Sequence, residues 1–351
     1  MIIVFAIAFI NKKKSPSCKG NAGIISIIIA CRNEEKNIKN LLKSLIYQEY
    51  ENEFEIIIID DHSTDSTLQI IKEINDKRVN LICLPTEFIG KKAALKFGVS
   101  KSKGDILLFT DADCIIPKNW ISNMANKLAK KNIDMLCGPV AFNKEKHFLN
   151  NLFRLEFISL TGSGASGFFI NKPFLCNGAN YAIRRNLYQK SIDKINDNYS
   201  SGDDIFLLQH ISKNGKAEFF NSPEVIVQTN APSNLREFFK QRIRWASKTT
   251  GYKDFFPLFV AITSFSMSLI TLALPIIAIF YYDLWKAFLI LIFSKTIIDT
   301  LMLTPMCKFH NQTKLIFSIP ILQIFHPIYI IITAVLSLFY KPYWKGRKIK
   351  A

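Results

Sequence analysis

The sequence predicts an α/β domain built on a mostly parallel sheet, followed by a C-terminal bundle of transmembrane helices. Short runs rich in isoleucine, IISIIIA at 24–30 and EIIII at 55–59, are each followed by a segment with helical periodicity. Apolar strands without polar alternation, joined by helices, are typical of parallel sheets covered on both faces. After Phe255 the sequence becomes mostly apolar, and this shift marks the start of the membrane part.

The strand and helix candidates alternate through the first part of the chain. Strands are expected at 24–30, 55–59, 80–84, 105–110 and 133–140, and helices at 34–46, 67–74 and 91–100. Ligands of open parallel sheets bind outside the carboxyl ends of the strands. Three polar strand exits, Arg32-Asn33, Asp60-Asp61 and Asp111-Ala112-Asp113, are therefore expected at one edge of the sheet.

Asp111 and Asp113 directly follow the buried run ILLFT. A single acidic pair after a strand usually only solvates its loop, whereas carboxylates gathered in a cleft repel one another and require a cation. Hard oxygen ligands of this kind suit Mg²⁺ or Mn²⁺ bridging phosphates. Neither a GxxxxGK[ST] loop nor a GxGxxG fingerprint is present, which argues against P-loop and dinucleotide-binding enzymes.

The charge balance narrows the partners. Lys and Arg number 45 against 28 Asp and Glu, a net charge of +17 over 351 residues. This excess suits nucleic acid, an anionic membrane surface or phosphate-bearing substrates. No nucleic-acid-binding module is recognisable, so we expect the last two and no nucleic acid. The seven scattered cysteines lack CxxC spacing, which argues against a disulfide framework or a zinc site.

An ordered set of motifs spans residues 24–245. It comprises IISIIIACRNEEKNI, EIIIIDDHSTDST, GKKAALKFGV, FTDADC, CNGANYAIRR, SGDDIFLL and QRIRW. In order and spacing this set resembles the family 2 glycosyltransferases, which have a GT-A fold. Three positions depart from the family pattern: Ala30 replaces a common proline, His62 a common glycine, and Asp203-Asp204 the usual Glu-Asp pair.

The resemblance implies a nucleotide-sugar site with a divalent metal, Mn²⁺ or Mg²⁺. Asp61 matches the position that accepts hydrogen bonds from uracil, and Asp60 would support its loop; both could instead cap the helix that starts near Ser63. Asp113 matches the metal ligand, and Asp111 would contact the ribose or act on the metal indirectly. Two cations, Lys91 and Arg32, complete the residues expected around the donor.

Asp204 matches the catalytic base of the family, and Asp203 a supporting carboxylate. Inversion requires a carboxylate that takes the acceptor proton while the hydroxyl attacks the anomeric carbon. The alternative is a helix cap, because a helix is expected at 205–211.

Gln241, Arg244 and Trp245 are spaced i, i+3 and i+4, so they share one helical face. The resemblance implies that Trp245 holds the acceptor sugar while Gln241 and Arg244 contact the donor diphosphate. An amphipathic helix at the membrane surface would show the same composition. The NGAN run, with Asn177, Gly178 and Asn180, resembles an acceptor-side loop, although Asn-Gly is by default a turn signal.

We expect four parts: a membrane-associated segment 1–22, a GT-A domain 23–230, an interfacial helix 231–254 and a membrane part 255–351. Spanning segments are expected at 257–282, 284–306 and 315–340, whereas the ten apolar residues at the start are too few to span. Lys295 and Asp299 are expected to form an ion pair within the second segment.

The predicted function is inverting transfer of a sugar from a UDP-sugar to a lipid or glycan acceptor, at the cytoplasmic face of a bacterial membrane. A processive polysaccharide synthase and a non-catalytic membrane scaffold are the alternatives. Three crossings would place the basic tail outside, against the positive-inside rule. Re-entry of the last segment, which contains Pro320 and Pro327, would remove this conflict.

Overall fold

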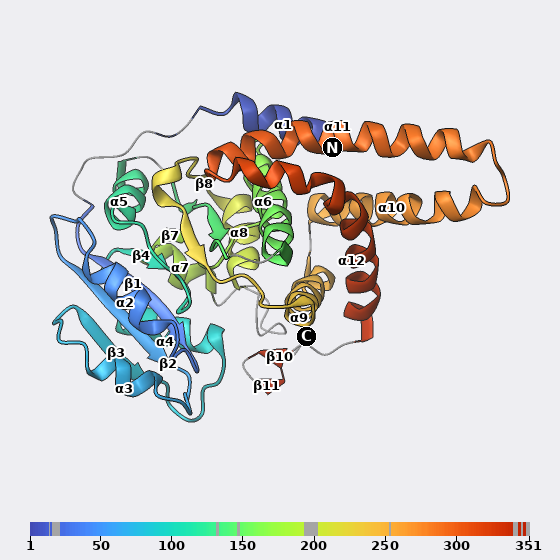
Figure 1. Ribbon diagram of the computed structural model, residues 1–351. Helices are drawn as coiled ribbons and strands as arrows, with labels where there is room; N and C mark the ends of the chain where they lie inside the picture. The colour runs from blue at the N-terminus through green and yellow to red at the C-terminus, as the bar shows by residue number, and fades with distance from the viewer. Residues whose placement is uncertain are drawn as a thin grey trace.

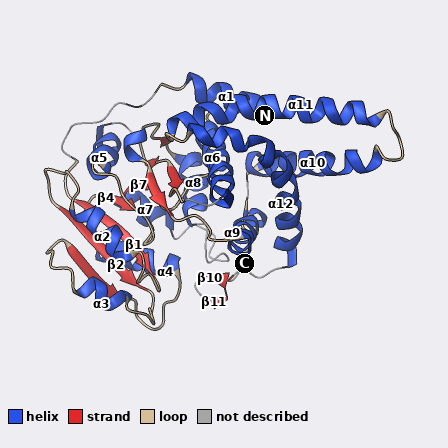
Figure 2. Cartoon of the chain, in the orientation of Figure 1, coloured by secondary structure: helices blue, strands red, loops and turns tan. Residues whose placement is uncertain are grey.

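The computed structural model describes residues 1–13, 15, 22–130, 133–145, 148–192, 203–252, 254–339, 343–344 and 347–348. Its soluble part is built on a seven-stranded sheet with the order β3-β2-β1-β4-β7-β5-β8 (Figures 1 and 2). These strands are β1 (Ile25–Cys31), β2 (Phe54–Asp60), β3 (Val79–Cys83), β4 (Ile106–Phe109), β5 (Met135–Cys137), β7 (Tyr181–Arg184) and β8 (Ala217–Phe219). Only β7 runs antiparallel to its neighbours, so the prediction of a mostly parallel sheet is confirmed.

Helices cover both faces of this sheet because successive strand residues point to opposite sides. They are α2 (Ile38–Ile46), α3 (Thr67–Lys72), α4 (Lys91–Lys101), α5 (Trp120–Lys130), α7 (Arg185–Ile192) and α8 (Asp203–Asn214). Ile27 and Ile29 of β1 belong to the buried cluster that includes α2 and α5. Ile28 belongs to the cluster with α4, α7 and α8.

The strand register brings the polar exits together as expected. Cys31 lies beside Asp60 in the parallel β1–β2 pair, and Ile28 lies beside Phe109 in the β1–β4 pair. The residues that follow β1, β2 and β4 therefore leave the sheet at the same edge.

Two of the predicted elements differ clearly from the structure. The helix predicted at 34–46, α2, begins at Ile38 rather than residue 34, because residues 35–37 form a turn. The single strand expected at 133–140 is broken at Gly138-Pro139, where proline has no N–H for a ladder. The next strand, β6 (Val140–Phe142), overlaps the predicted strand only at Val140 and pairs with β9 (Val227–Thr229) in a separate sheet.

The remaining helices lie in or beside the second part of the domain and in the apolar part that follows it. They are α6 (Phe148–Phe169), η1 (Pro223–Val225), α9 (Leu235–Ala246), η2 (Thr249–Gly251), α10 (Phe255–Ile277), α11 (Leu284–Phe309), η3 (Thr313–Ser318) and α12 (Ile319–Phe339). Helices α10 and α11 form a hairpin that projects from the body, and α12 turns away from α11 part way along its length (Figure 1). Pro327 lies inside α12 and accounts for such a bend. The chain ends in a short hairpin, β10 (Tyr343–Trp344) and β11 (Arg347–Lys348).

Three segments are long and apolar enough to cross a membrane, by length and composition: Phe255–Ile277, Leu284–Phe309 and Thr313–Phe339. They correspond to the three predicted spans. The predicted ion pair inside the second span is confirmed, with Lys295 Nζ 2.5 Å from Asp299 Oδ2. Gln323 of α12 completes it by accepting from Lys295 at 2.7 Å and donating to Asp299 at 2.7 Å. The pair therefore also joins α11 to α12.

The N-terminal helix α1 (Ile2–Asn11) packs against α6 and α11. Phe5 and Phe9 are buried, with Phe5 stacked on Phe174 at 5.9 Å and Phe9 edge-on to Phe309 at 5.9 Å. Most of the remainder of the predicted segment 1–22, residues 14 and 16–21, lies outside the described part of the chain.

Candidate active site

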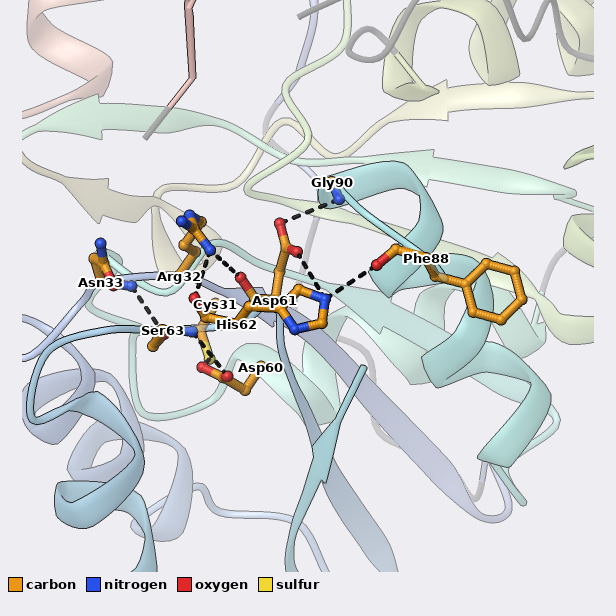
Figure 3. Close-up of polar contacts among 9 residues, drawn as sticks. All are labelled: Cys31, Arg32, Asn33, Asp60, Asp61, His62, Ser63, Phe88 and Gly90. Atoms are coloured by element: carbon orange, nitrogen blue, oxygen red, sulfur yellow. Dashed lines mark hydrogen bonds and ion pairs between the residues drawn. The ribbon is translucent and has the colours of Figure 1, made fainter. Parts of the chain in front are cut away.

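The exits of β1 and β2 form one hydrogen-bonded loop pair, drawn in Figure 3. Asp60 accepts the backbone N–H of Ser63 at 3.0 Å, so it caps the turn that follows β2. Asp61 is fully buried, and its Oδ2 accepts the N–H of Gly90 at 3.2 Å. Asp61 thereby ties the end of β2 to the start of α4. Asp60 thereby supports this loop, and it caps no helix, because α3 begins only at Thr67.

Arg32 holds the backbone of this loop. Its Nη1 donates to the carbonyl oxygens of Asp61 at 2.6 Å and His62 at 2.5 Å (Figure 3). His62 has φ 55°, a left-handed conformation that costs a non-glycine residue about 1–2 kcal/mol. This backbone explains why glycine suits the position. The imidazole of His62 lies 3.1 Å from the carbonyl oxygen of Phe88, which helps to hold the strained residue.

Asp111 and Asp113 lie in the loop that follows β4, where the charged form of Asp113 is disfavoured. Burial, together with the negative charges of Asp111 and Glu34, raises the pKa of Asp113 to about 6. Asp111 Oδ1 is 2.5 Å from Lys91 Nζ, and Asp113 Oδ2 accepts from Thr229 Oγ1 at 3.1 Å. A buried carboxylate with a raised pKa gains from a nearby cation.

The residues at this edge fit a metal that arrives with its substrate. Among the residues that the structure describes, no three His, Cys, Asp or Glu side chains are grouped closely enough to hold an ion. Mg²⁺ commonly binds through one or two carboxylates together with substrate phosphates. Asp113 and Asp111 supply such an incomplete set, and the diphosphate of a nucleotide-sugar would supply the rest.

Asp204 lies at the start of α8 and is held by backbone donors. Its Oδ2 accepts the N–H of Gly178 at 2.8 Å, and its Oδ1 that of Ile205 at 2.9 Å. A Cβ at position 178 would lie 3.2 Å from Oδ2, so glycine permits this close approach. Asn177 Oδ1 accepts the N–H of Ala179 at 3.0 Å and shapes the turn. For Asp203, the structure describes the backbone only, as the first residue of α8.

Asn180 was expected on the acceptor side of the site, but it does not line the cavity of about 910 Å³ that holds Asp204 and Asn177. It is fully buried, its Nδ2 donates to the carbonyls of Pro139 and Val225 at 2.8 Å each, and its Oδ1 accepts from Trp120 Nε1 at 2.8 Å. Its amide thus joins three segments of the core. A Cβ at Gly138 would meet the Asn180 side chain at 2.4 Å, which explains the glycine there.

The α9 helix presents Gln241, Arg244 and Trp245 to the same cavity. Burial lowers the pKa of Arg244, and the charges of Asp111, Asp204 and Asp113 oppose that shift. The guanidinium is therefore within electrostatic reach of all three acids. A cation placed among these carboxylates can bind an anionic group that enters with a metal.

Arg242, on a neighbouring face of α9, forms a buried network that the sequence reasoning missed. Its guanidinium makes a two-point ion pair with Glu156 of α6, and Tyr329 of α12 donates to Glu156 Oε1 at 2.7 Å. Arg242 Nη1 also donates to Gln241 Oε1 at 2.7 Å, and its guanidinium lies 4.3 Å from the ring centre of Trp245. Arg242 thereby positions two cavity residues and joins α9 to a membrane helix.

Replacing one partner of this pair is expected to destabilise the protein strongly. Glu156→Gln keeps the shape but leaves the Arg242 charge buried, and breaking a buried pair costs about 3–5 kcal/mol. Thermal unfolding of the detergent-solubilised chain should show a clearly lowered midpoint. Glu73→Gln, an exposed carboxylate on the turn after α3, is the matched control and should change little. Equal midpoints for the two variants would contradict a stabilising role for the network.

One cavity of about 910 Å³ gathers most of the predicted residues. They are Lys91, Asp111, Asp113, Asn177, Gly178, Asp204, Gln241, Arg244 and Trp245. Arg32, Asp60 and Asp61 lie beside it in the β1–β2 loop pair rather than in its lining. The cavity also contains Glu34, Thr229, Lys248 and Tyr252. Of these four residues, only Glu34 could have been predicted from the sequence, because it directly follows the polar pair Arg32-Asn33 at the end of β1.

Comparisons with known proteins agree on one family. The model of glycosyl transferase family 2 matches residues 26–192. An N-acetylglucosaminyltransferase of Mesorhizobium japonicum is 25% identical over 64% of this chain and 55% of its own length. An uncharacterized glycosyltransferase of Haemophilus influenzae is 36% identical over 35% of this chain and 49% of its own. The chain spans about half the length of these curated relatives.

A third relative and a solved structure extend the comparison. A Methanococcus voltae enzyme, named as a dolichyl N-acetyl-alpha-D-glucosaminyl phosphate 3-beta-D-2,3-diacetamido-2,3-dideoxy-beta-D-glucuronosyltransferase, is 27% identical over 64% of this chain and 72% of its own. The mannosyltransferase PcManGT of Pyrobaculum calidifontis, solved with GDP-Man and Mn²⁺, has a TM-score of 0.57 and 16% identity. That match covers 97% of this chain and 99% of the other, and it shows the fold. Residues 26–192 therefore form a domain of glycosyltransferase family 2 with a GT-A fold, and three later helices of the described chain could span a membrane by length and composition.

Proposed function

We propose that the chain transfers a sugar, with inversion, from a UDP-sugar to a hydroxyl of a membrane-associated acceptor. One observation carries the proposal. The carboxylates of Asp111 and Asp113 line a single cavity together with Asp204 and Arg244. A nucleotide-sugar transferase has to neutralise a leaving diphosphate and deprotonate an acceptor hydroxyl. Asp111 and Asp113 serve the first need together with a cation, and Asp204 serves the second.

Asp113, with Asp111 beside it, would hold Mn²⁺ or Mg²⁺, which supplies charge neutralisation at the diphosphate. Arg244 binds the same diphosphate from α9, and Lys91 reaches it from the start of α4. The mannosyltransferase PcManGT was solved with Mn²⁺, which supports a divalent metal in this fold.

Asp204 accepts the proton of the acceptor hydroxyl as the hydroxyl attacks the anomeric carbon. The N–H groups of Gly178 and Ile205 both donate to this carboxylate and keep it oriented. Trp245 supports the acceptor sugar with its ring, and Arg242 holds that ring in place. Asn177 and Gly178 shape the wall on this side.

Asp61 would accept a hydrogen bond from the uracil after a local movement that exposes its side chain, which is fully buried in this structure. Arg32 holds the loop that carries it. The Gly90 N–H occupies one oxygen of Asp61, so a bound base shares this carboxylate with the start of α4. The acceptor is a lipid or a glycan at the membrane. The name of the Methanococcus voltae relative, a transferase onto a dolichyl phosphate-linked sugar, supports a lipid.

A donor screen tests this proposal. Thermal unfolding of the full chain is measured with Mn²⁺ and each of UDP-GlcNAc, UDP-glucose and GDP-mannose, with and without EDTA. We expect stabilisation by at least one UDP-sugar that disappears with EDTA, because a ligand that binds only the folded state raises its stability. If no nucleotide-sugar stabilises the protein and no UDP is released with a lipid extract, the non-catalytic scaffold is supported instead.

The number of sugars added separates this proposal from the processive alternative. The described residues contain three helices that could span a membrane, which are few for a polysaccharide channel, so we expect a single addition per acceptor. Gel analysis of products from a radiolabelled donor would reveal one product band. A ladder of polymers would instead establish a synthase.

A further inference from the structure

The cavity that holds the candidate catalytic residues continues between two of the membrane helices. Beyond Trp245, its walls are formed by α10, with Val260, Ala261 and Phe265, and by α12, with Ile330 and Ala334. These two helices pack against each other along the cavity. The acidic end and the apolar end therefore belong to one continuous space of about 910 Å³.

The apolar end opens where side chains of α10 and α12 are exposed. Ile262, Val335 and Leu338 line the cavity, yet they are 55%, 45% and 71% exposed. Both helices belong to segments that are long and apolar enough to cross a membrane. Large exposed apolar side chains on such helices face lipid, so this mouth opens sideways toward the bilayer.

Polar side chains of the wall between the two ends are bonded within the protein: Ser337 donates to the carbonyl of Ala334 at 2.8 Å, and Tyr329 donates to Glu156 at 2.7 Å. The hydroxyl of Thr333 donates to the carbonyl of Tyr329 in its own helix at 2.7 Å. Arg244, Trp245 and Lys248 line the cavity from α9 and the turn after it. Polar and cationic groups thus stand between the carboxylates and the hydrocarbon wall, an order that matches an acceptor with a polar head and an apolar chain. A water-soluble glycan would require hydrogen-bonding groups along this passage.

We propose that the acceptor is lipid-linked, and that its hydrocarbon chain enters from the bilayer and lies between α10 and α12. This inference rests on the proposed function, because it names the substrate class of the same site. The head group would reach Asp204 past Trp245, while the chain stays in an apolar setting throughout. The passage therefore positions the head group of the acceptor while its hydrocarbon chain stays in apolar surroundings.

A blocking substitution tests the passage. Ala334→Trp places an indole in the wall, and Ala287→Trp makes the same change at an exposed position of α11 outside the cavity. The full chain in detergent is irradiated with a C16 lipid that carries a diazirine in its chain, and the labelled peptides are identified by mass spectrometry. In the natural chain we expect label at 257–265 and 330–338. Ala334→Trp should lower it at least about 10-fold, since one methylene of misfit in an apolar pocket costs about 10–200-fold, while Ala287→Trp should not lower it.

The donor assay separates the two levels of the proposal. UDP-sugar stabilisation with Mn²⁺ should be the same in both variants, because the passage is remote from the carboxylates. Even labelling of the outward faces of α10–α12, unaffected by Ala334→Trp while donor stabilisation persists, would overturn the lipid path and leave the proposed function standing. Absence of donor stabilisation in the natural chain would refute the proposed function itself. If Ala334→Trp does not fold, Ala261→Trp on the opposite wall gives the same comparison.

Discussion

Asp204→Asn is expected to lower kcat for sugar transfer by about 10²–10⁴-fold, the usual cost of losing a general base. The dissociation constant of the UDP-sugar should stay close to that of the natural chain, because this carboxylate acts on the acceptor hydroxyl. The asparagine keeps one oxygen that can accept the N–H of Gly178, so the loop at 177–180 should hold its shape. Steady-state kinetics with a surrogate acceptor and a donor titration measure the two quantities.

Asp203→Asn is the matched control for that experiment. It removes a carboxylate from the adjacent residue, and we expect a milder loss because Asp203 corresponds to a supporting acid. The opposite outcome, with an inactive Asp203→Asn and an active Asp204→Asn, would show that the assignment is displaced by one residue. Full activity in both variants would leave the inverting mechanism without its base.

Asp113→Asn is expected to abolish the Mn²⁺-dependent binding of the donor and, with it, turnover. The amide retains an oxygen for Thr229, so the local structure should persist while the charge opposite the metal is lost. Even outer-shell partners of a metal typically contribute 10–100-fold in affinity or activity, so loss of a direct ligand should exceed this. Thermal stabilisation by donor and Mn²⁺ gives the readout. Full activity of Asp113→Asn in the presence of EDTA would refute a metal at this edge.

The raised pKa of Asp113, about 6, adds a pH dependence to metal binding. A metal ligand has to be deprotonated, so protons compete with the ion below the pKa of the carboxyl. The affinity of the natural chain for Mn²⁺ in the presence of donor should be steady above pH 7 and fall as the pH drops through 6. Calorimetric titrations across this range would detect the fall, and a flat profile would contradict it.

The sequence by itself determined the parallel half of the sheet and the place of the polar exits. The runs at β1, β2 and β4 are too apolar to face water, and helices between them impose a parallel register. Parallel register then brings Arg32, Asp61 and Asp113 to one edge without any knowledge of the fold. Hydrophobic length likewise identified the three membrane segments, and the i, i+4 spacing of Lys295 and Asp299 predicted their pair.

Only the tertiary structure decided which side chains meet across long separations. The periodicity of α9 placed Gln241, Arg244 and Trp245 on one face, but it carried no sign that Arg242 pairs with Glu156. Nor did it show that Glu156 also accepts a hydrogen bond from Tyr329. These partners lie on α6 and α12, and their meeting depends on how three helices pack.

The antiparallel β7 and the core position of Asn180 have the same origin. Asn180 bonds backbone groups of Pro139 and Val225, 41 and 45 residues away. Local sequence patterns predict the secondary structure and the buried face of each element, because both follow from the order of residues within that element. Contacts between distant elements arise only when the elements pack, and this packing determined that the candidate catalytic cavity continues between α10 and α12.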